Sequence, residues 1–215
     1  MRSPIHTRSG SPVHGRLAAL PAGAVPEGTP RRILEAALRL FARVGFHGTS
    51  VRDLAKQCRL QPGALYAHFP SKDHILAELA RLGHEVHQAA VRAELLRAGA
   101  DPREQLRAFV RAHATMHATH PQLAMVANEE LYALPKELAA PALALRKQSA
   151  VLLIDILDRG VTAGWFKCRN LLVTAAAIGA IGLRIPYWYE PGGGLEVKAL
   201  AEVQAELALR MVGCG

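Results

Sequence analysis

From residue 30 to its end, the chain repeats hydrophobic residues at the spacing of an α-helix. In the first stretch, for example, Ile33, Ala37 and Phe41 fall on one face. No segment alternates hydrophobic and polar residues with the period of two that marks a β-strand. The pattern predicts an all-α protein of about nine helices. Their expected ranges are 30–44, 50–59, 63–69, 72–98, 102–118, 122–133, 136–160, 170–189 and 195–212.

The positive charge of the chain is concentrated at its N-terminal end. The sequence has 26 lysines and arginines against 18 aspartates and glutamates, a formal net charge of +8. Residues 1–72 hold eleven of the basic residues and only three of the acidic ones, which accounts for the whole excess. A basic head on a neutral body indicates binding to a polyanion, most often nucleic acid. The alternative is a basic tail that only improves solubility.

Prolines and glycines mark the expected division of the chain. Residues 1–29 mix proline, glycine, serine and arginine without a hydrophobic run, which predicts a disordered basic arm and no secretory signal. Residues 30–75 and 76–215 are expected to form a small and a large helical domain.

Cysteine usage and hydropathy indicate where the protein works. Cys58, Cys168 and Cys214 are few and far apart, which favours a reducing cytoplasm over a disulfide framework. The longest apolar run, Leu171 to Leu183, is shorter than the about 20 residues of a membrane-spanning helix. We therefore expect a cytoplasmic protein with no membrane partner.

The helices 50–59 and 63–69 are short and are joined by a tight turn at Pro62-Gly63, which predicts a helix-turn-helix. Ser50 and Asp53 have the spacing of a capping box. Leu65 and Phe69 would face the domain core, and the small side chains of Ala64 and Ala67 would allow close approach to base edges. An ordinary helical hairpin is the alternative. The expected DNA contacts are Thr49, Ser50, Gln61, Gly63, Ala64, Tyr66, Ala67, His68 and Lys72.

This segment also resembles a known family. The sequence G-F-H-G-T-S at 45–50, followed by G-A-L-Y-A-H-F-P-S-K at 63–72, closely resembles the DNA-binding region of the TetR (tetracycline repressor) family of bacterial regulators. The resemblance implies a homodimer in which each domain 30–75 reads a half-site of a palindromic operator in double-stranded DNA. It further implies that domain 76–215 binds a small-molecule effector and dimerises through its last two long helices.

The last two predicted helices suit a dimer interface on their own composition. Residues 171–189 are apolar almost all round, and Gly179 and Gly182 would allow close packing. A helix that is apolar on every side is expected to be buried, here between the core and a partner subunit. The helix 195–212 carries one apolar stripe, formed by Leu195, Leu200, Val203, Leu207 and Met211.

An arginine within this apolar helix suggests the effector. Arg184 stands one turn before Trp188, and Pro186 between them predicts a kink. A buried arginine needs an anion, and a tryptophan offers a flat stacking surface, so a bulky anion such as an acyl-CoA would suit both. Alternatively, Arg184 pairs within the protein with Glu129, Glu130 or Asp155. The expected ligand residues are Arg184, Trp188, Tyr187, Met125, Asn128 and Tyr132.

The segment 145–189 is similar to regulators of lipid or steroid catabolism within the family, some of which respond to CoA thioesters. The resulting hypothesis is a ligand-responsive regulator, a repressor released by an acyl-CoA or another lipid-derived anion. A regulator that responds to a hydrophobic drug or cationic compound is the alternative.

Two histidine pairs raise the question of a metal. His84 and His87, and likewise His113 and His117, have spacings compatible with metal ligation, but no carboxylate or cysteine pattern completes either pair. We therefore expect neither a metal nor a cofactor, and histidines that line a pocket or the surface. The sequence contains no nucleophile elbow or phosphate-binding glycine loop, so we do not expect an enzyme. A purely structural DNA-binding protein would not need residues 73–215.

Overall fold

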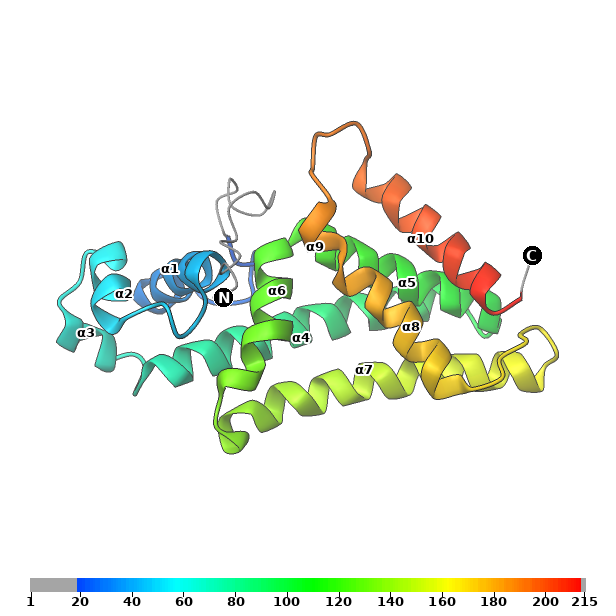
Figure 1. Ribbon diagram of the computed structural model, residues 1–215, viewed down its shortest axis with the longest axis horizontal. Coiled ribbons are helices and arrows are strands. Elements are labelled where there is room, and N and C mark those ends of the chain that lie inside the picture. Colours follow the sequence, from blue (N-terminus) through cyan, green and yellow to red (C-terminus); the bar gives the residue numbers. More distant parts are fainter. Residues whose placement is uncertain (1–18, 214–215) are drawn as a thin grey trace, which may run out of the picture.

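The computed structural model describes residues 19–213, which form helices joined by short loops (Figure 1). The all-α prediction is confirmed, since no strand occurs in this range. The helices are α1 (Thr29–Val44), α2 (Val51–Cys58), α3 (Pro62–Tyr66), α4 (Lys72–Ala98), α5 (Pro102–Thr119), α6 (Pro121–Glu129), the 3-10 helix η2 (Glu130–Ala133), α7 (Lys136–Thr162), α8 (Leu171–Leu183), α9 (Ile185–Trp188) and α10 (Val197–Met211).

Three predicted helices differ from the structure. The expected helix 170–189 is divided at Arg184 into α8 and α9, because Pro186 in the first turn of α9 has no N–H to donate backwards. The expected helix 122–133 ends as the 3-10 helix η2. The expected helix 63–69 stops at Tyr66.

The long helix α4 connects two parts of the molecule. Helices α1 to α3 form a head at one end, and α4 starts beside them and runs into the body formed by α5 to α10 (Figure 1). Along its length α4 packs against α1, α5, α6 and α7. One hydrophobic core includes Phe41 and Leu65 of the head together with Leu76 of α4 and Leu123 of α6. The head is therefore packed onto the body through a shared core.

The segment before α1 packs against the head, which differs from the expected disordered arm 1–29. The side chain of Leu20 is buried. Arg31 of α1 donates hydrogen bonds to the backbone oxygens of Leu20 and Val25 at 2.9 and 3.0 Å, and it pairs with Glu35 at 3.1 Å. These contacts fasten residues 20–25 to α1. The rest of the predicted arm, residues 1–18, lies outside the described residues.

The helix starts in the head follow local hydrogen bonding. The predicted capping box of α2 is confirmed, because the Ser50 hydroxyl accepts from the Asp53 N–H at 3.1 Å and the Asp53 carboxylate accepts from the Ser50 N–H at 3.0 Å. Ser71 caps α4, since its hydroxyl accepts from the His74 N–H at 3.4 Å. Helix α1 starts at Thr29, after Gly28, and has no side-chain cap.

One amino group joins the loop before α2 to the start of α4. The ammonium of Lys72 donates to the backbone oxygens of Phe46 and Thr49, both at 2.8 Å, and lies 4.1 Å from the centre of the Phe46 ring. The buried Thr49 hydroxyl donates to the backbone oxygen of Gly45 at 2.9 Å. Both residues are among the expected DNA contacts. In the structure Thr49 is buried and Lys72 is half-buried, and both hold the head together from inside.

A largely apolar, exposed face lies on α8 and α10. Its exposed hydrophobic side chains are Leu172, Val173, Leu195, Val203, Leu207 and Met211. By length and composition, Leu171–Trp188 is apolar enough to cross a membrane, with 28% of it buried, and it is the single such stretch among residues 19–213. This test is weak evidence, because it is also met by apolar helices that pack against protein.

The contacts of Lys72 give a first testable prediction. Lys72→Met keeps most of the aliphatic chain but leaves the Phe46 and Thr49 carbonyls without their charged donor, so the free energy of unfolding should fall by about 1–3 kcal/mol. Urea unfolding measures this loss. Lys56→Met, at an exposed position of α2, serves as the control and should change stability by less than about 0.5 kcal/mol. Equal stabilities of the two variants would contradict the internal role of Lys72.

Candidate functional site

The short helix α3 presents the predicted DNA-contacting residues to solvent. Leu65 is buried in the head core and holds α3 against α2. A Cβ atom placed at Gly63 would meet no other atom within 4 Å, so another molecule can approach the backbone there. Small side chains at an exposed helix start suit entry into the major groove. The exposed predicted contacts are Ser50, Gln61, Gly63, Ala64, Tyr66, Ala67 and His68.

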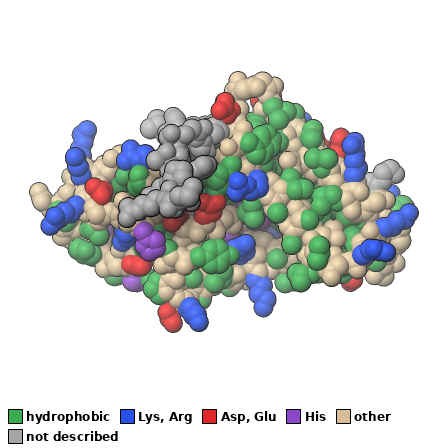
Figure 2. Space-filling view, viewed as in Figure 1, with side chains coloured by type: hydrophobic (Ala, Val, Ile, Leu, Met, Phe, Trp, Pro, Cys, Tyr) green, Lys and Arg blue, Asp and Glu red, His purple; other side chains and the backbone are tan. Residues whose placement is uncertain are grey.

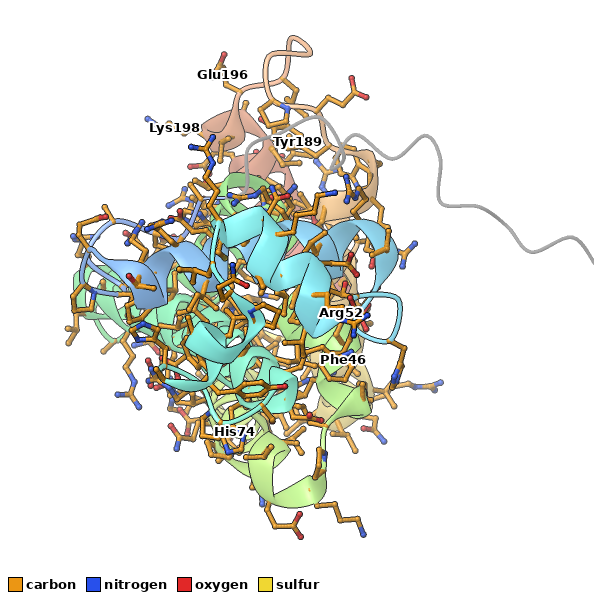
Figure 3. All side chains as sticks on the ribbon, turned by 90° about the vertical axis from the view of Figure 1, so that its left-hand side faces the viewer. Phe46, Arg52, His74, Tyr189, Glu196 and Lys198 are labelled. Carbon is orange, nitrogen blue, oxygen red and sulfur yellow. The ribbon has the colours of Figure 1, made fainter. Side chains whose placement is uncertain are left out.

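The basic charge of the head is only partly available to a partner. Arg31 and Lys72 are occupied by contacts inside the protein. The side chains of Arg43, Arg52, Lys56 and Arg59 are exposed. Figure 3 looks at this end of the molecule and labels Arg52 on α2 near the loop that carries Phe46. Figure 2 shows lysine and arginine side chains projecting from the same end.

The body contains a cavity of about 420 Å³ among α4, α5, α6, α7 and α8. Two glycines let its walls come together. A Cβ atom at Gly83 of α4 would lie 2.5 Å from the Ala127 Cβ of α6, and one at Gly182 of α8 would lie 2.0 Å from the His113 ring of α5. The residues that line the cavity are mainly apolar: Phe109, Met116, Ala127, Ala150, Leu153, Ile154, Leu172, Ala175, Ala176, Ala180 and Leu183.

The four histidines of the two predicted pairs meet at this cavity. His84 and His87 come from α4, and His113 and His117 come from α5. The His113 and His117 ring centres are 4.3 Å apart, and those of His87 and His113 are 5.0 Å apart. Among residues 19–213, no group of three histidine, cysteine or carboxylate side chains is arranged to hold a metal ion. The cluster is instead a polar patch in an apolar cavity.

Burial keeps these four rings neutral. Desolvation lowers the pKa of His84 to about 4, helped by the positive charge of Arg146, and lowers the pKa of His113 to about 4. Desolvation, followed by repulsion from His113, lowers the pKa of His87 to about 3. The same two causes hold the pKa of His117 well below its usual value. At neutral pH the cluster therefore carries no charge.

Arg146 of α7 is the one permanently charged side chain among the described residues that line the cavity. Its guanidinium donates to the Tyr132 hydroxyl at 2.7 Å and lies 6.0 Å from the centre of the Tyr132 ring. None of the lining side chains described is an aspartate or glutamate. The electrostatics of the cavity therefore favour an anionic group near Arg146 over a cation.

Most of the predicted ligand residues do not line this cavity. Arg184 is exposed at the break between α8 and α9, where its guanidinium lies 4.0 Å from the centre of the Tyr187 ring, and Trp188 is 51% exposed. The argument from a buried arginine is therefore wrong, because the helix break carries Arg184 to the surface. Met125 is buried away from the cavity. Tyr132 reaches the cavity only through Arg146.

Asn128 is the one predicted ligand residue that does line the cavity. Its side-chain amide donates to the Ala124 backbone oxygen at 2.8 Å. Arg146 and Ser149 of α7 also line the cavity and are not among the predicted ligand residues. Their signal is the helical spacing 146, 149, 150, 153, which places two polar residues on the same face as Ala150 and Leu153.

A second hollow, of about 680 Å³, lies between α4, α5 and α10. Charged side chains line it, and two of them, Arg111 of α5 and Glu202 of α10, pair with each other at 2.6 Å. These charged side chains stand among apolar ones, so this hollow is more polar than the histidine-lined cavity. The histidine-lined cavity is the better candidate for an apolar ligand.

The structure also connects the cavity to the head. Ala127 and Asn128 of α6 line the cavity, and the chain continues directly into η2. In η2 the carboxylate of Glu130 accepts a hydrogen bond from the backbone N–H of Phe46 at 3.2 Å. Phe46 in turn contacts Lys72 at the start of α4. Both α4 and α6 therefore run from the cavity to the head.

The neutral histidines predict a pH dependence of stability. An unfolded histidine has a pKa of about 6.5, so below that pH the unfolded chain binds protons that the folded cluster excludes. The free energy of unfolding should therefore fall between pH 7 and pH 5, by about 2 kcal/mol for each ring whose pKa is near 4. Urea unfolding at pH 7, 6 and 5 measures this slope. The same stability at pH 7 and pH 5 would contradict the neutral cluster.

The sequence matches family descriptions in both parts of the structure. Residues 33–79, in the head and the start of α4, match "Bacterial regulatory proteins, tetR family". Residues 99–212, which form most of the body, match "Tetracyclin repressor-like, C-terminal domain".

Similar proteins extend over most of the chain. The HTH-type transcriptional repressor KstR2 of Rhodococcus jostii (strain RHA1) is 28% identical over 191 residues, covering 85% of this chain and 90% of that protein. The crystal structure of a tetR-family regulatory protein from Rhodococcus RHA1 is 30% identical with a TM-score of 0.82, covering 88% and 100% of the two chains. AibR, crystallised with isovaleryl coenzyme A and operator DNA, is 25% identical with a TM-score of 0.75, covering 84% and 97%. The chain belongs to the TetR family of bacterial transcriptional regulators.

Proposed function

We propose that this protein is a repressor that binds a palindromic operator as a homodimer and leaves the DNA when an effector fills the histidine-lined cavity. The observation that carries this proposal is that α4 and α6 each contribute to the cavity and also contact the head. Such a protein acts on DNA in the bacterial cytoplasm, and none of these steps requires catalysis.

The cavity supports an effector with an apolar body and an anionic group. Its walls are mainly apolar, and Arg146 is positioned to pair with a carboxylate, a phosphate or the oxygen of a thioester. An acyl-CoA has both features, and the similar protein AibR was crystallised with isovaleryl coenzyme A. The alternative, a cationic compound, is less well supported because a cation would lie beside Arg146 with no lining carboxylate to balance it.

Release from DNA requires that the effector fit one arrangement of the head better than another. A ligand that presses on α4 and α6 near Gly83 would change how these tightly packed helices lie against each other. The change would reach the head through Glu130 and Phe46 and through Lys72. Two recognition helices of a dimer must stand about 34–36 Å apart to enter successive major grooves, so a small shift is enough to weaken binding.

The exposed apolar face of α8 and α10 supports the homodimer. The space-filling view shows hydrophobic side chains over the part of the molecule where these helices lie (Figure 2). Val203, Leu207 and Met211 recur every fourth residue along α10, as expected for a helix that packs on a second helix. A Cβ atom placed at Gly179 of α8 would meet no other atom within 4 Å, so there is free space on that side of the helix.

The role of Arg146 can be tested by effector-driven release from DNA. Arg146→Met removes the charge and keeps most of the apolar volume, so DNA affinity should be unchanged while the concentration of CoA thioester for half release rises about tenfold or more. The operator is a duplex selected by the protein from a random pool, and the thioesters range from isovaleryl-CoA to longer acyl chains. Fluorescence anisotropy of labelled duplex measures release.

Arg184→Met is the matched control for this experiment, because Arg184 is exposed and lies outside the cavity lining. This variant should release DNA at the wild-type thioester concentration. Half release of Arg146→Met at that same concentration would contradict the role of Arg146. Failure of every thioester to release the wild-type protein would contradict the acyl-CoA class of effector.

A further inference from the structure

Two of the histidines that line the cavity each have one ring nitrogen with no hydrogen-bond partner within the protein. These nitrogens are the Nε2 atoms of His84 and His117, both inaccessible to solvent in the folded chain. A buried polar atom without a partner costs stability, so such an atom in a ligand cavity is a candidate for recognition. What it can recognise depends on whether it carries a proton.

The hydrogen bond of His117 fixes where its proton lies. The Nδ1 of His117 is 2.8 Å from the backbone oxygen of His113. A carbonyl oxygen only accepts hydrogen bonds, so the Nδ1 of His117 carries the proton. Because the ring is neutral, its Nε2 carries a lone pair and can only accept. His117 therefore offers the cavity an acceptor.

The same reasoning applies to His84. Its ring makes a hydrogen bond with the backbone of Ala127 that favours the protonated ring, as donation to a carbonyl oxygen does. Since the Nε2 of His84 has no partner, the donor is Nδ1. The Nε2 of this neutral ring is therefore also an acceptor.

The other two histidines are satisfied and have no group left for a ligand. The Nε2 of His113 donates to the backbone oxygen of Gly179 at 3.1 Å, which leaves the Nδ1 of His113 as an acceptor. His87 donates to that Nδ1 from its Nε2 at 2.9 Å. The Nδ1 of His87 then faces the Ser149 hydroxyl at 3.5 Å. His87 and His113 therefore each have a defined tautomer. The hydrogen bonds run in one direction, from Ser149 through His87 and His113 to the Gly179 backbone oxygen.

We infer that the cavity selects an effector that carries a neutral hydrogen-bond donor, a hydroxyl or an N–H, on its apolar body. This inference rests on the proposed function, which places the effector in the cavity, and it specifies what the buried part of that effector must carry. A ketone, an ester or a carboxylate would bring its lone pairs against those of His84 and His117. A hydroxyl satisfies either nitrogen, while the anionic end of the molecule remains near Arg146.

A pair of small bicyclic probes tests this selection. 2-Decalol and 2-decalone share one carbon skeleton and differ in that only the alcohol can donate a hydrogen bond. Calorimetry with the full chain at pH 7.5 should give at least about tenfold tighter binding of 2-decalol. Equal or tighter binding of 2-decalone would overturn the inference and leave the cavity as a binding site. Failure of both probes to bind would overturn the cavity as the effector site, and the inference with it.

Matched variants locate the selection at the unpartnered nitrogens. His117→Phe keeps a ring of similar size but removes the acceptor, so the preference for 2-decalol should fall about tenfold, and His84→Phe provides the same test if His117→Phe does not fold. His47→Phe makes the same change at an exposed position of the head and should keep the wild-type preference. An undiminished preference in folded His117→Phe and His84→Phe proteins would overturn the assignment to these histidines.

Discussion

The structure depends on one helix being shared between the head and the cavity. Helix α4 has 27 residues and is about 40 Å long at 1.5 Å per residue. Its first residue, Lys72, holds the loop before α2, and about three to four turns further on Gly83, His84 and His87 form a wall of the cavity. A continuous helix transmits a displacement along its axis. The position of the head therefore depends on how α4 packs in the body.

Local sequence signals predict the helices of the head and the capping box of α2. The Ser50–Asp53 capping box depends on neighbouring residues, so the sequence predicts it directly. The turn predicted at Pro62-Gly63 lies instead at residues 59–61, because Arg59 takes the left-handed conformation and Pro62 starts α3. The inward roles of Thr49 and Lys72 depend on a contact between α4 and a loop more than 20 residues earlier. Residue type alone could not separate this role from a phosphate contact, because the same ammonium can bind a carbonyl or a phosphate oxygen.

The cavity was harder to predict because five helices build it. Arg184 looked like a buried ligand residue when helix 170–189 was taken as continuous, but the break before Pro186 places it at the surface. The histidine spacing on α4 and α5 was recognised, yet only packing shows that the two pairs meet in one desolvated cluster. Arg146 and Ser149 share a face of α7 with Ala150 and Leu153, but only the packing of α7 against α4 and α8 shows that this face lines the cavity. Sequence therefore identifies the helices but not which of their faces enclose the cavity.

In the proposed mechanism, occupation of the cavity and binding to DNA oppose each other through α4 and α6. Such coupling is reciprocal, so the most direct measurement is the affinity for one releasing CoA thioester, with the protein alone and with the protein saturated with operator DNA. Operator DNA should weaken thioester binding by the same factor by which the thioester weakens DNA binding, about 5–150-fold. Equal thioester affinity in the presence and absence of operator DNA would contradict this mechanism.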